Sequence, residues 1–222
     1  MPPYRRFAIY YTPPKGAFAD AASAWLGWDA ARGEPVAHPP APMDVAAITA
    51  TPRKYGIHAT IKAPFRPTTD QDGLRAALRD WARGRAPVVL DGLDLTVIDG
   101  FIALIPATPS AALQDLAASA VRDLDHLRAP LTEAEIARRR PERLDARERE
   151  LLDRWGYPYV MEQFQFHMTL SGPLSDPAPV MGWLADNLVP LIPRPFTIDA
   201  MTLCGEAEDG RFHELDRIPL GP

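Results

Sequence analysis

The chain has 222 residues, 46% of them apolar, which is enough to bury the core of one large domain or of two small lobes. Its formal net charge of −5 argues against a protein that holds long nucleic acid by general electrostatics, because such binding neutralises many phosphates at once. One cysteine, Cys204, excludes an internal disulfide and a cysteine-rich metal site and is typical of a reducing compartment. No segment approaches the roughly 20 apolar residues that span a bilayer, so we expect a cytoplasmic protein with no membrane partner.

The first half of the chain combines strand and helix patterns. Residues 56–65 (GIHATIKAPF) alternate strictly, with Ile57, Ala59 and Ile61 on one face and His58, Thr60 and Lys62 on the other. Such alternation predicts a half-buried strand. The other elements expected here are, in chain order, a strand at 7–11, a helix at 17–26, a Pro-rich loop at 35–42, an amphipathic helix at 72–85, and strands at 88–97 and 101–105 that meet at the turn Asp99–Gly100.

The middle of the chain predicts helices. Residues 109–128 carry an apolar stripe at helical spacing, and Thr132 with Glu135 forms a capping box for a further helix that is interrupted at Pro141 and resumes to Trp155. Residues 138–154 contain seven arginines and five acids, a mixture that favours a solvated helix over an anion-binding surface.

The pattern of the first half returns near the end of the chain. Residues 162–171 alternate again, with Phe166 and Met168 on one face and His167 and Thr169 on the other. A helix at 180–188, a strand at 196–203, the turn Asp209–Gly210 and a strand at 212–218 follow.

This recurrence indicates an internal repeat. To within one residue, the interval between His58 and His167 equals that between the turn glycines Gly100 and Gly210. We therefore expect one bilobal domain over 1–222, with a first lobe motif around 56–106, a second around 160–219, and a helical connection around 109–156. Two similar lobes predict a pseudo-twofold cleft.

Two copies of His-x-Thr carry the chemistry. His58 with Thr60 and His167 with Thr169 each lie on the polar face of an alternating strand, so that both side chains of a pair point the same way. A hydroxyl can donate to a nonbridging phosphate oxygen while an imidazole moves a proton to or from a bridging one. We predict that the histidines are an acid/base pair and the threonines phosphate ligands, with water attacking phosphorus directly.

Neighbouring residues give weaker predictions. Lys62 lies on the face of His58 and Thr60 and is expected to neutralise a charged group of the substrate; Tyr55 is expected to contact the substrate by stacking or hydrogen bonding. Zinc or iron bound by the histidines is disfavoured, because the sequence has no H-x-x-x-H or H-x-H spacing and no acid within either motif. We expect no cofactor.

The motifs HATI and HMTL resemble those of the two-histidine (2H) phosphoesterase superfamily. The stretches YGIHATIKAPF, WGYPYVMEQFQFHMTLSGPL and WLGWD are similar to the branch associated with phosphonate-utilisation operons. The resemblance implies an α+β fold of two small antiparallel sheets flanked by helices around a central cleft. It also implies metal-independent hydrolysis of a small cyclic phosphate, with His58, Thr60, His167 and Thr169 as the active site.

For the branch, the resemblance implies a role beside carbon-phosphorus lyase and a phosphorylated ribose 1,2-cyclic phosphate as substrate. An alternative is an enzyme that acts on 2′,3′-cyclic phosphate at RNA ends. A further alternative is a non-catalytic protein that binds nucleotides or sugar phosphates. The acidic balance weighs against long RNA as a partner.

Overall fold

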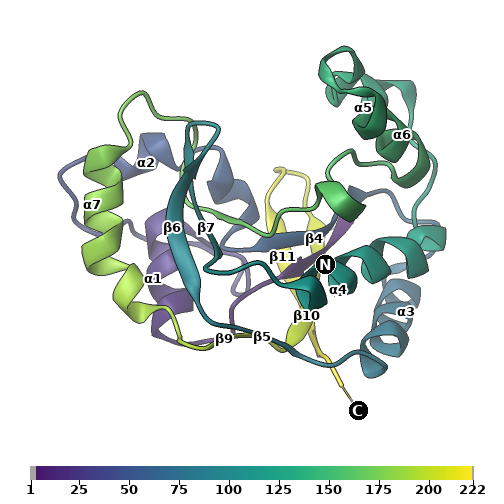
Figure 1. Cartoon of the computed structure of the whole chain (residues 1–222), viewed down its shortest axis with the longest axis horizontal. Coiled ribbons are helices and arrows are strands. Elements are labelled where there is room, and N and C mark those ends of the chain that lie inside the picture. Colours follow the sequence, from purple (N-terminus) through teal and green to yellow (C-terminus); the bar gives the residue numbers. More distant parts are fainter. Residues whose placement is uncertain (1–3, 222) are drawn as a thin grey trace.

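The computed structural model describes residues 4–221, which are built around an antiparallel sheet of seven strands (Figure 1). The strand order is β11-β10-β1-β4-β8-β7-β6. Two short ribbons, β2 with β3 and β5 with β9, lie beside this sheet. The strands are β1 (Arg6–Tyr11), β2 (Trp28–Asp29), β3 (Glu34–Pro35), β4 (Ala59–Phe65), β5 (Val88–Leu90), β6 (Leu93–Ile98), β7 (Phe101–Pro106), β8 (Met168–Thr169), β9 (Phe196–Ile198), β10 (Ala200–Glu206) and β11 (Phe212–Pro219).

The large sheet has two halves that meet where β4 lies antiparallel to β8, with Ala59 opposite Met168. On one side of this join lie β11, β10, β1 and β4, and on the other lie β8, β7 and β6. The hairpin β6–β7 of the first repeat is thus in the same half of the sheet as β8, the histidine strand of the second repeat. The hairpin β10–β11 of the second repeat is in the same half as β4, the histidine strand of the first repeat. The two expected antiparallel sheets are the halves of this continuous sheet, and each half takes strands from both repeats.

Helices flank the sheet on both sides (Figure 1). In the view of Figure 1, α1, α2 and α7 lie to the left of the sheet and α3 and α4 to its right, while α5 and α6 project at the upper right. The α+β class predicted from the sequence is confirmed. The helices are α1 (Ala17–Leu26), α2 (Val45–Ile48), α3 (Gln71–Arg83), α4 (Ala111–Asp123), α5 (Glu133–Arg138), α6 (Ala146–Trp155) and α7 (Ala178–Asn187). None of these helices is both long and apolar enough to cross a membrane.

The helix signals in the sequence are confirmed in the middle of the chain. The apolar stripe of α4, which includes Leu113, Leu116 and Ala120, is buried. Thr132 and Glu135 form the predicted capping box of α5, and the chain breaks into a short 3₁₀ turn at Pro141–Arg143 before α6. Proline removes a backbone donor and clashes with the preceding turn, which explains why one long helix does not form.

The second histidine strand is shorter than its alternation predicts. Only Met168–Thr169 pair as a strand, and Met161–Gln163 form a 3₁₀ turn. After Leu170, which donates its N–H to the Ile102 carbonyl at 2.8 Å, the Ser171 hydroxyl accepts the Ile102 N–H at 2.9 Å. A side chain therefore takes the place of the next backbone acceptor, and the ladder ends there.

A buried tryptophan ties α1 to this strand. Trp25 is 0% exposed, its indole N–H donates to the Leu170 carbonyl at 2.8 Å, and its ring stacks on Trp183 of α7 with centroids 4.9 Å apart. We predict that Trp25→Phe lowers the free energy of unfolding by about 1–3 kcal/mol, because the buried carbonyl loses its donor. Urea denaturation followed by far-ultraviolet circular dichroism measures the change.

Trp183→Phe is the matched control, since it retains an aromatic ring in the stack and Trp183 is only partly buried. It should cost less than Trp25→Phe. Equal losses in the two variants would show that the hydrogen bond to Leu170 contributes nothing.

Candidate active site

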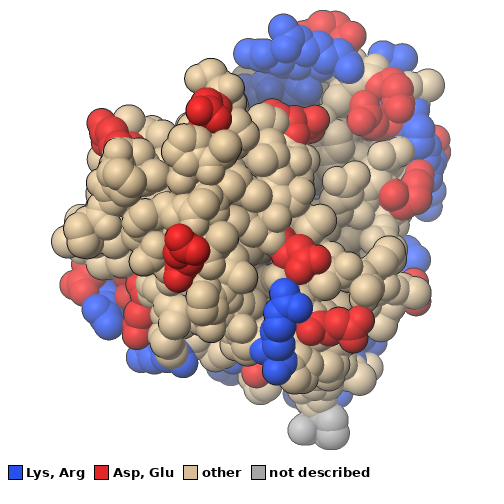
Figure 2. All heavy atoms as spheres, turned by 60° about the vertical axis from the view of Figure 1, so that its left-hand side comes forward, with Lys and Arg blue, Asp and Glu red and all other residues tan. Residues whose placement is uncertain are grey.

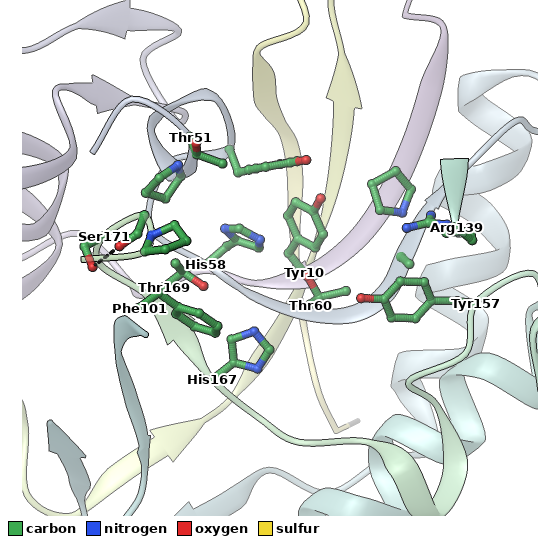
Figure 3. A pocket seen from close by; sticks show the side chains of 16 residues that line it. Tyr10, Thr51, His58, Thr60, Phe101, Arg139, Tyr157, His167, Thr169 and Ser171 are labelled. Atoms are coloured by element: carbon green, nitrogen blue, oxygen red, sulfur yellow. Dashed lines mark hydrogen bonds between the residues drawn. The ribbon is translucent and has the colours of Figure 1, made fainter. Parts of the chain in front are cut away.

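The pairing of β4 with β8 brings the two His-x-Thr motifs together. With Ala59 opposite Met168 in an antiparallel pair, one step in each direction sets His58 across from Thr169 and Thr60 across from His167. Figure 3 shows these four side chains grouped in one cavity. Each histidine therefore lies beside the threonine of its own motif and that of the other.

Both imidazoles are held by the same local hydrogen bond. Nδ1 of His58 lies 3.0 Å from the Gly56 carbonyl, and Nδ1 of His167 lies 2.8 Å from the Gln165 carbonyl. A carbonyl only accepts, so Nδ1 carries the proton in each ring. Nε2 is then the atom that can take up or release a proton at the substrate. The repeat thus extends to the tautomer of both rings.

The rings differ in their surroundings. The His58 ring lies 4.2 Å, centroid to centroid, from Tyr10 and 5.4 Å from Tyr55, and both tyrosines also contact Phe212. His167 has Phe101 at 5.9 Å. His58 is therefore the more enclosed of the two by aromatic side chains.

This enclosure changes the protonation of His58. Burial lowers the pKa of His58 to about 4, the hydrogen bond to Gly56 acts in the opposite direction, and the charge of His167 lowers it further. Desolvation disfavours the imidazolium form, so His58 is neutral at pH 7. A neutral ring with a free Nε2 can serve as a general base.

The cavity around the motifs has a volume of about 290 Å³, at the lower end of the range for small-molecule sites. Tyr55, for which the sequence predicts contact with the substrate, is one of the residues that line it. The lining also includes residues that sequence reasoning missed: Tyr10, Thr51, Phe101, Arg139, Tyr157 and Ser171. They come from elements distant in sequence from both motifs.

Lys62 does not line this cavity, which corrects the prediction that it binds the substrate. Thr60 pairs with Tyr10, yet Lys62 pairs with Ile9, so β4 has a bulge with one extra residue between them. The bulge reverses the alternation and leaves Lys62 3% exposed. Its ammonium donates to the Val121 carbonyl at 3.3 Å and to the Asp125 carboxylate at 3.4 Å.

The buried ion pair also changes the chemistry of Lys62. Burial lowers its pKa to about 8, and the Asp125 carboxylate opposes this effect. Lys62 therefore fastens β4 to the region of α4 behind the site. Its role is structural.

The remaining histidines lie outside the cavity lining. Nδ1 of His38 bonds to the Trp25 carbonyl, His213 packs against Trp28 and Tyr4, and His126 is exposed. Cys204 is buried, which raises the pKa of its thiol. Within residues 4–221, no group of three or more His, Cys, Asp or Glu side chains is placed to hold a metal ion.

Residues 60–213 match the family described as "Protein of unknown function (DUF1045)". The chain is 37% identical over 229 residues to a protein of Janthinobacterium sp. (strain Marseille), covering 97% of the chain and 51% of that protein. It is 39% identical over 187 residues to one of Laribacter hongkongensis (strain HLHK9), covering 81% and 43%. Both are named "Ribose 1,5-bisphosphate phosphokinase PhnN", and the chain spans about half the length of these curated relatives.

Solved structures similar to this chain include one of E. coli LigT and one described as a phosphoesterase. The structure of E. coli LigT complexed with phosphate has 13% sequence identity and a TM-score of 0.44, and the match covers 99% of both chains. A structure described as a phosphoesterase has 15% identity and a TM-score of 0.45, with 98% of this chain and 99% of that chain covered.

The environment of His58 predicts its titration. We expect the carbon and proton shifts of its ring, followed by NMR from pH 8 to pH 3.5, to report the neutral Nδ1–H tautomer down to a midpoint near pH 4. In His167→Gln the midpoint should rise but stay below 6.5, because the charge of His167 is lost while burial remains. A midpoint near 6.5 in the unaltered protein would contradict the enclosure described for His58.

Proposed function

Since the chain belongs to the DUF1045 family, whose description leaves the activity open, function is inferred from the site, and we propose a cyclic phosphodiesterase of the two-histidine type. One observation carries the proposal. The two His-x-Thr pairs lie side by side on the paired strands β4 and β8 and line one cavity, each imidazole holding its Nδ1 proton on a backbone carbonyl and leaving Nε2 for the substrate.

The geometry supports direct attack by water. His58 takes a proton from water at Nε2 while the water oxygen forms a bond to phosphorus. The bond from phosphorus to one ring oxygen breaks, and His167 donates its Nε2 proton to that oxygen. Thr60 and Thr169 donate hydrogen bonds to the nonbridging oxygens. The product is a phosphate monoester, and exchange with solvent restores both rings.

The roles follow from the surroundings of the rings. The lowered pKa of His58 keeps its Nε2 unprotonated at neutral pH, as a base requires. His167 is less enclosed by aromatic side chains and is the ring left to donate a proton to the leaving oxygen. His58 is therefore the base and His167 the acid.

The names of the relatives bear on the substrate. They are named for phosphorylation of ribose 1,5-bisphosphate. Opening ribose 1,2-cyclic phosphate 5-phosphate at the bond between phosphorus and O2 yields ribose 1,5-bisphosphate. A phosphodiesterase acting on this cyclic ester, an intermediate that the phosphonate-branch resemblance implies, supplies the compound in their name. We propose this ester as the substrate.

The kinase activity in that name is not proposed for this chain. Phosphoryl transfer from ATP in P-loop kinases uses the sequence G-x-x-x-x-G-K-[ST], in which backbone N–H groups and the lysine hold the phosphates. The 222 residues contain no Gly-Lys pair. The paired histidines are suited to moving protons during ester hydrolysis.

Removing either histidine should abolish most turnover. We expect His58→Gln and His167→Gln each to lower kcat by roughly 10²- to 10⁴-fold, the usual cost of losing a positioned acid or base. Phosphorus NMR of chelator-treated protein with the cyclic ester measures the rate. His126→Gln is the control, because His126 is exposed and lies outside the cavity. Full turnover by a folded variant of His58 or His167 would refute the mechanism.

Substrate choice is tested by comparing two cyclic esters. Ribose 1,2-cyclic phosphate 5-phosphate should be hydrolysed by the unaltered protein to a species that co-resonates with ribose 1,5-bisphosphate in the phosphorus spectrum. A nucleoside 2′,3′-cyclic phosphate should react more slowly. Faster hydrolysis of the nucleotide would favour processing of RNA ends, and tight binding of either ester without turnover would favour a non-catalytic binding protein.

A further inference from the structure

One guanidinium enters the active-site cavity. Arg139 lines it together with both histidines and Tyr157, and it is the one Lys, Arg, Asp or Glu side chain in the described lining. Figure 3 shows Arg139 and Tyr157 at one end of the cavity and Ser171 at the other, with the histidines between them. The cavity therefore has a cationic end beside the His-x-Thr pairs.

Arg139 differs from Arg138, Arg147 and Arg149 in what it contacts. Arg147 pairs with Glu150 and Glu162, Arg149 donates to the Leu144 carbonyl, and Arg138 donates to the Ala134 carbonyl. Arg139 instead lies over the Tyr157 ring, 4.8 Å from its centroid. Within residues 4–221, its guanidinium has no carboxylate at salt-bridge distance. An aromatic face orients a guanidinium and leaves its N–H donors free for a ligand.

The position of Arg139 is linked to β4, the strand that carries Thr60. Arg139 is the C-cap residue that follows α5, whose first turn is held by the capping box of Thr132 and Glu135. The same Glu135 carboxylate accepts from Arg66, which follows β4, at 3.1 Å. The strand that carries Thr60 is thus linked through one ion pair to the helix that presents Arg139.

The charges of two adjoining hollows differ in sign. The hollow next to the cavity shares Thr60, Tyr157 and His167 with it but is also lined by Asp99 and Glu148, which would repel a second phosphate there. Basic side chains gather at the top of the molecule (Figure 2), where Figure 1 places α5 and α6. Within the described cavity lining, Arg139 is therefore the group that attracts an anionic part of the substrate.

We propose that Arg139, with the Tyr157 hydroxyl as a second donor, binds a terminal phosphate monoester of the substrate that is distinct from the cyclic phosphate at the histidines. The hydroxyl of Tyr157 points into the cavity toward Thr60 (Figure 3). Burial raises the pKa of Tyr157, so that it remains a donor at neutral pH. This inference rests on the proposed function and specifies its substrate class as a phosphorylated sugar cyclic phosphate.

Arg139→Gln tests the subsite by removing the charge at similar length. For ribose 1,2-cyclic phosphate 5-phosphate we expect KM to rise roughly 10- to 100-fold, the loss for a hydrogen bond to a charged group. For ribose 1,2-cyclic phosphate, which lacks the second phosphate, kcat/KM should stay near that of the unaltered protein. Arg139→Lys should recover part of the loss, since it restores the charge without the planar fork. The matched control is Arg138→Gln, whose side chain is exposed and lies outside the cavity.

A binding measurement separates this inference from the proposed reaction. By isothermal titration calorimetry, ribose 5-phosphate should bind the unaltered protein and Arg138→Gln alike and bind Arg139→Gln roughly 10-fold more weakly or worse. Such binding without turnover of any cyclic ester would refute the reaction and leave the subsite standing. Equal binding by Arg139→Gln, or an equal loss on both cyclic esters, would overturn the subsite while the reaction stands.

Discussion

The antiparallel pairing of Ala59 with Met168 is the constraint on which the site depends. Both side chains are 0% exposed, so the face of the sheet on which they lie belongs to the core. Alternation then directs the residues on either side of each to the opposite face. A slip of one residue would turn the histidines into the core and the apolar side chains into the cavity. Burial of the apolar face therefore fixes the active-site geometry.

This dependence explains why the motifs could be predicted from the sequence and some of their neighbours could not. Alternation and repetition identified His58, Thr60, His167 and Thr169, because period two and a shared interval are visible in one dimension. Lys62 was misplaced, since a bulge depends on the partner strand and leaves the alternating letters unchanged.

Arg139 could not be predicted as a site residue from the sequence, for a different reason. It belongs to a stretch with nearly balanced charges, in which Arg138, Arg147 and Arg149 do have acids or carbonyls to bind. Only the fold shows which guanidinium is turned toward the cavity and stacked on an aromatic ring. Tyr10 could not be predicted as a site residue either. It comes from the first strand, and its contact with His58 exists only because β1 lies beside β4.

A symmetric repeat thus gives an asymmetric site. The two histidines share a tautomer and a hydrogen bond to a carbonyl two residues earlier, but they differ in the aromatic rings beside them. Desolvation lowers the pKa of His58, and an environment that keeps one of two like groups unprotonated is what a base role requires. The exchange of strands between repeats supports this difference, because Tyr10 of β1 contacts His58 and Phe212 of β11 packs against Tyr10 and Tyr55.

The acidic balance of the chain is compatible with an anionic substrate, because screening makes the relevant charges local. At physiological ionic strength the field of a surface charge decays over about 8 Å. Many of the acids away from the cavity are paired with arginines, as Asp216 is with Arg75 and Arg79. The described lining holds no carboxylate and one guanidinium, so a small phosphate ester meets a positive site within a negative protein. Long RNA would have to lie across the acidic surface as well, which disfavours it relative to a ligand that fits within the cavity.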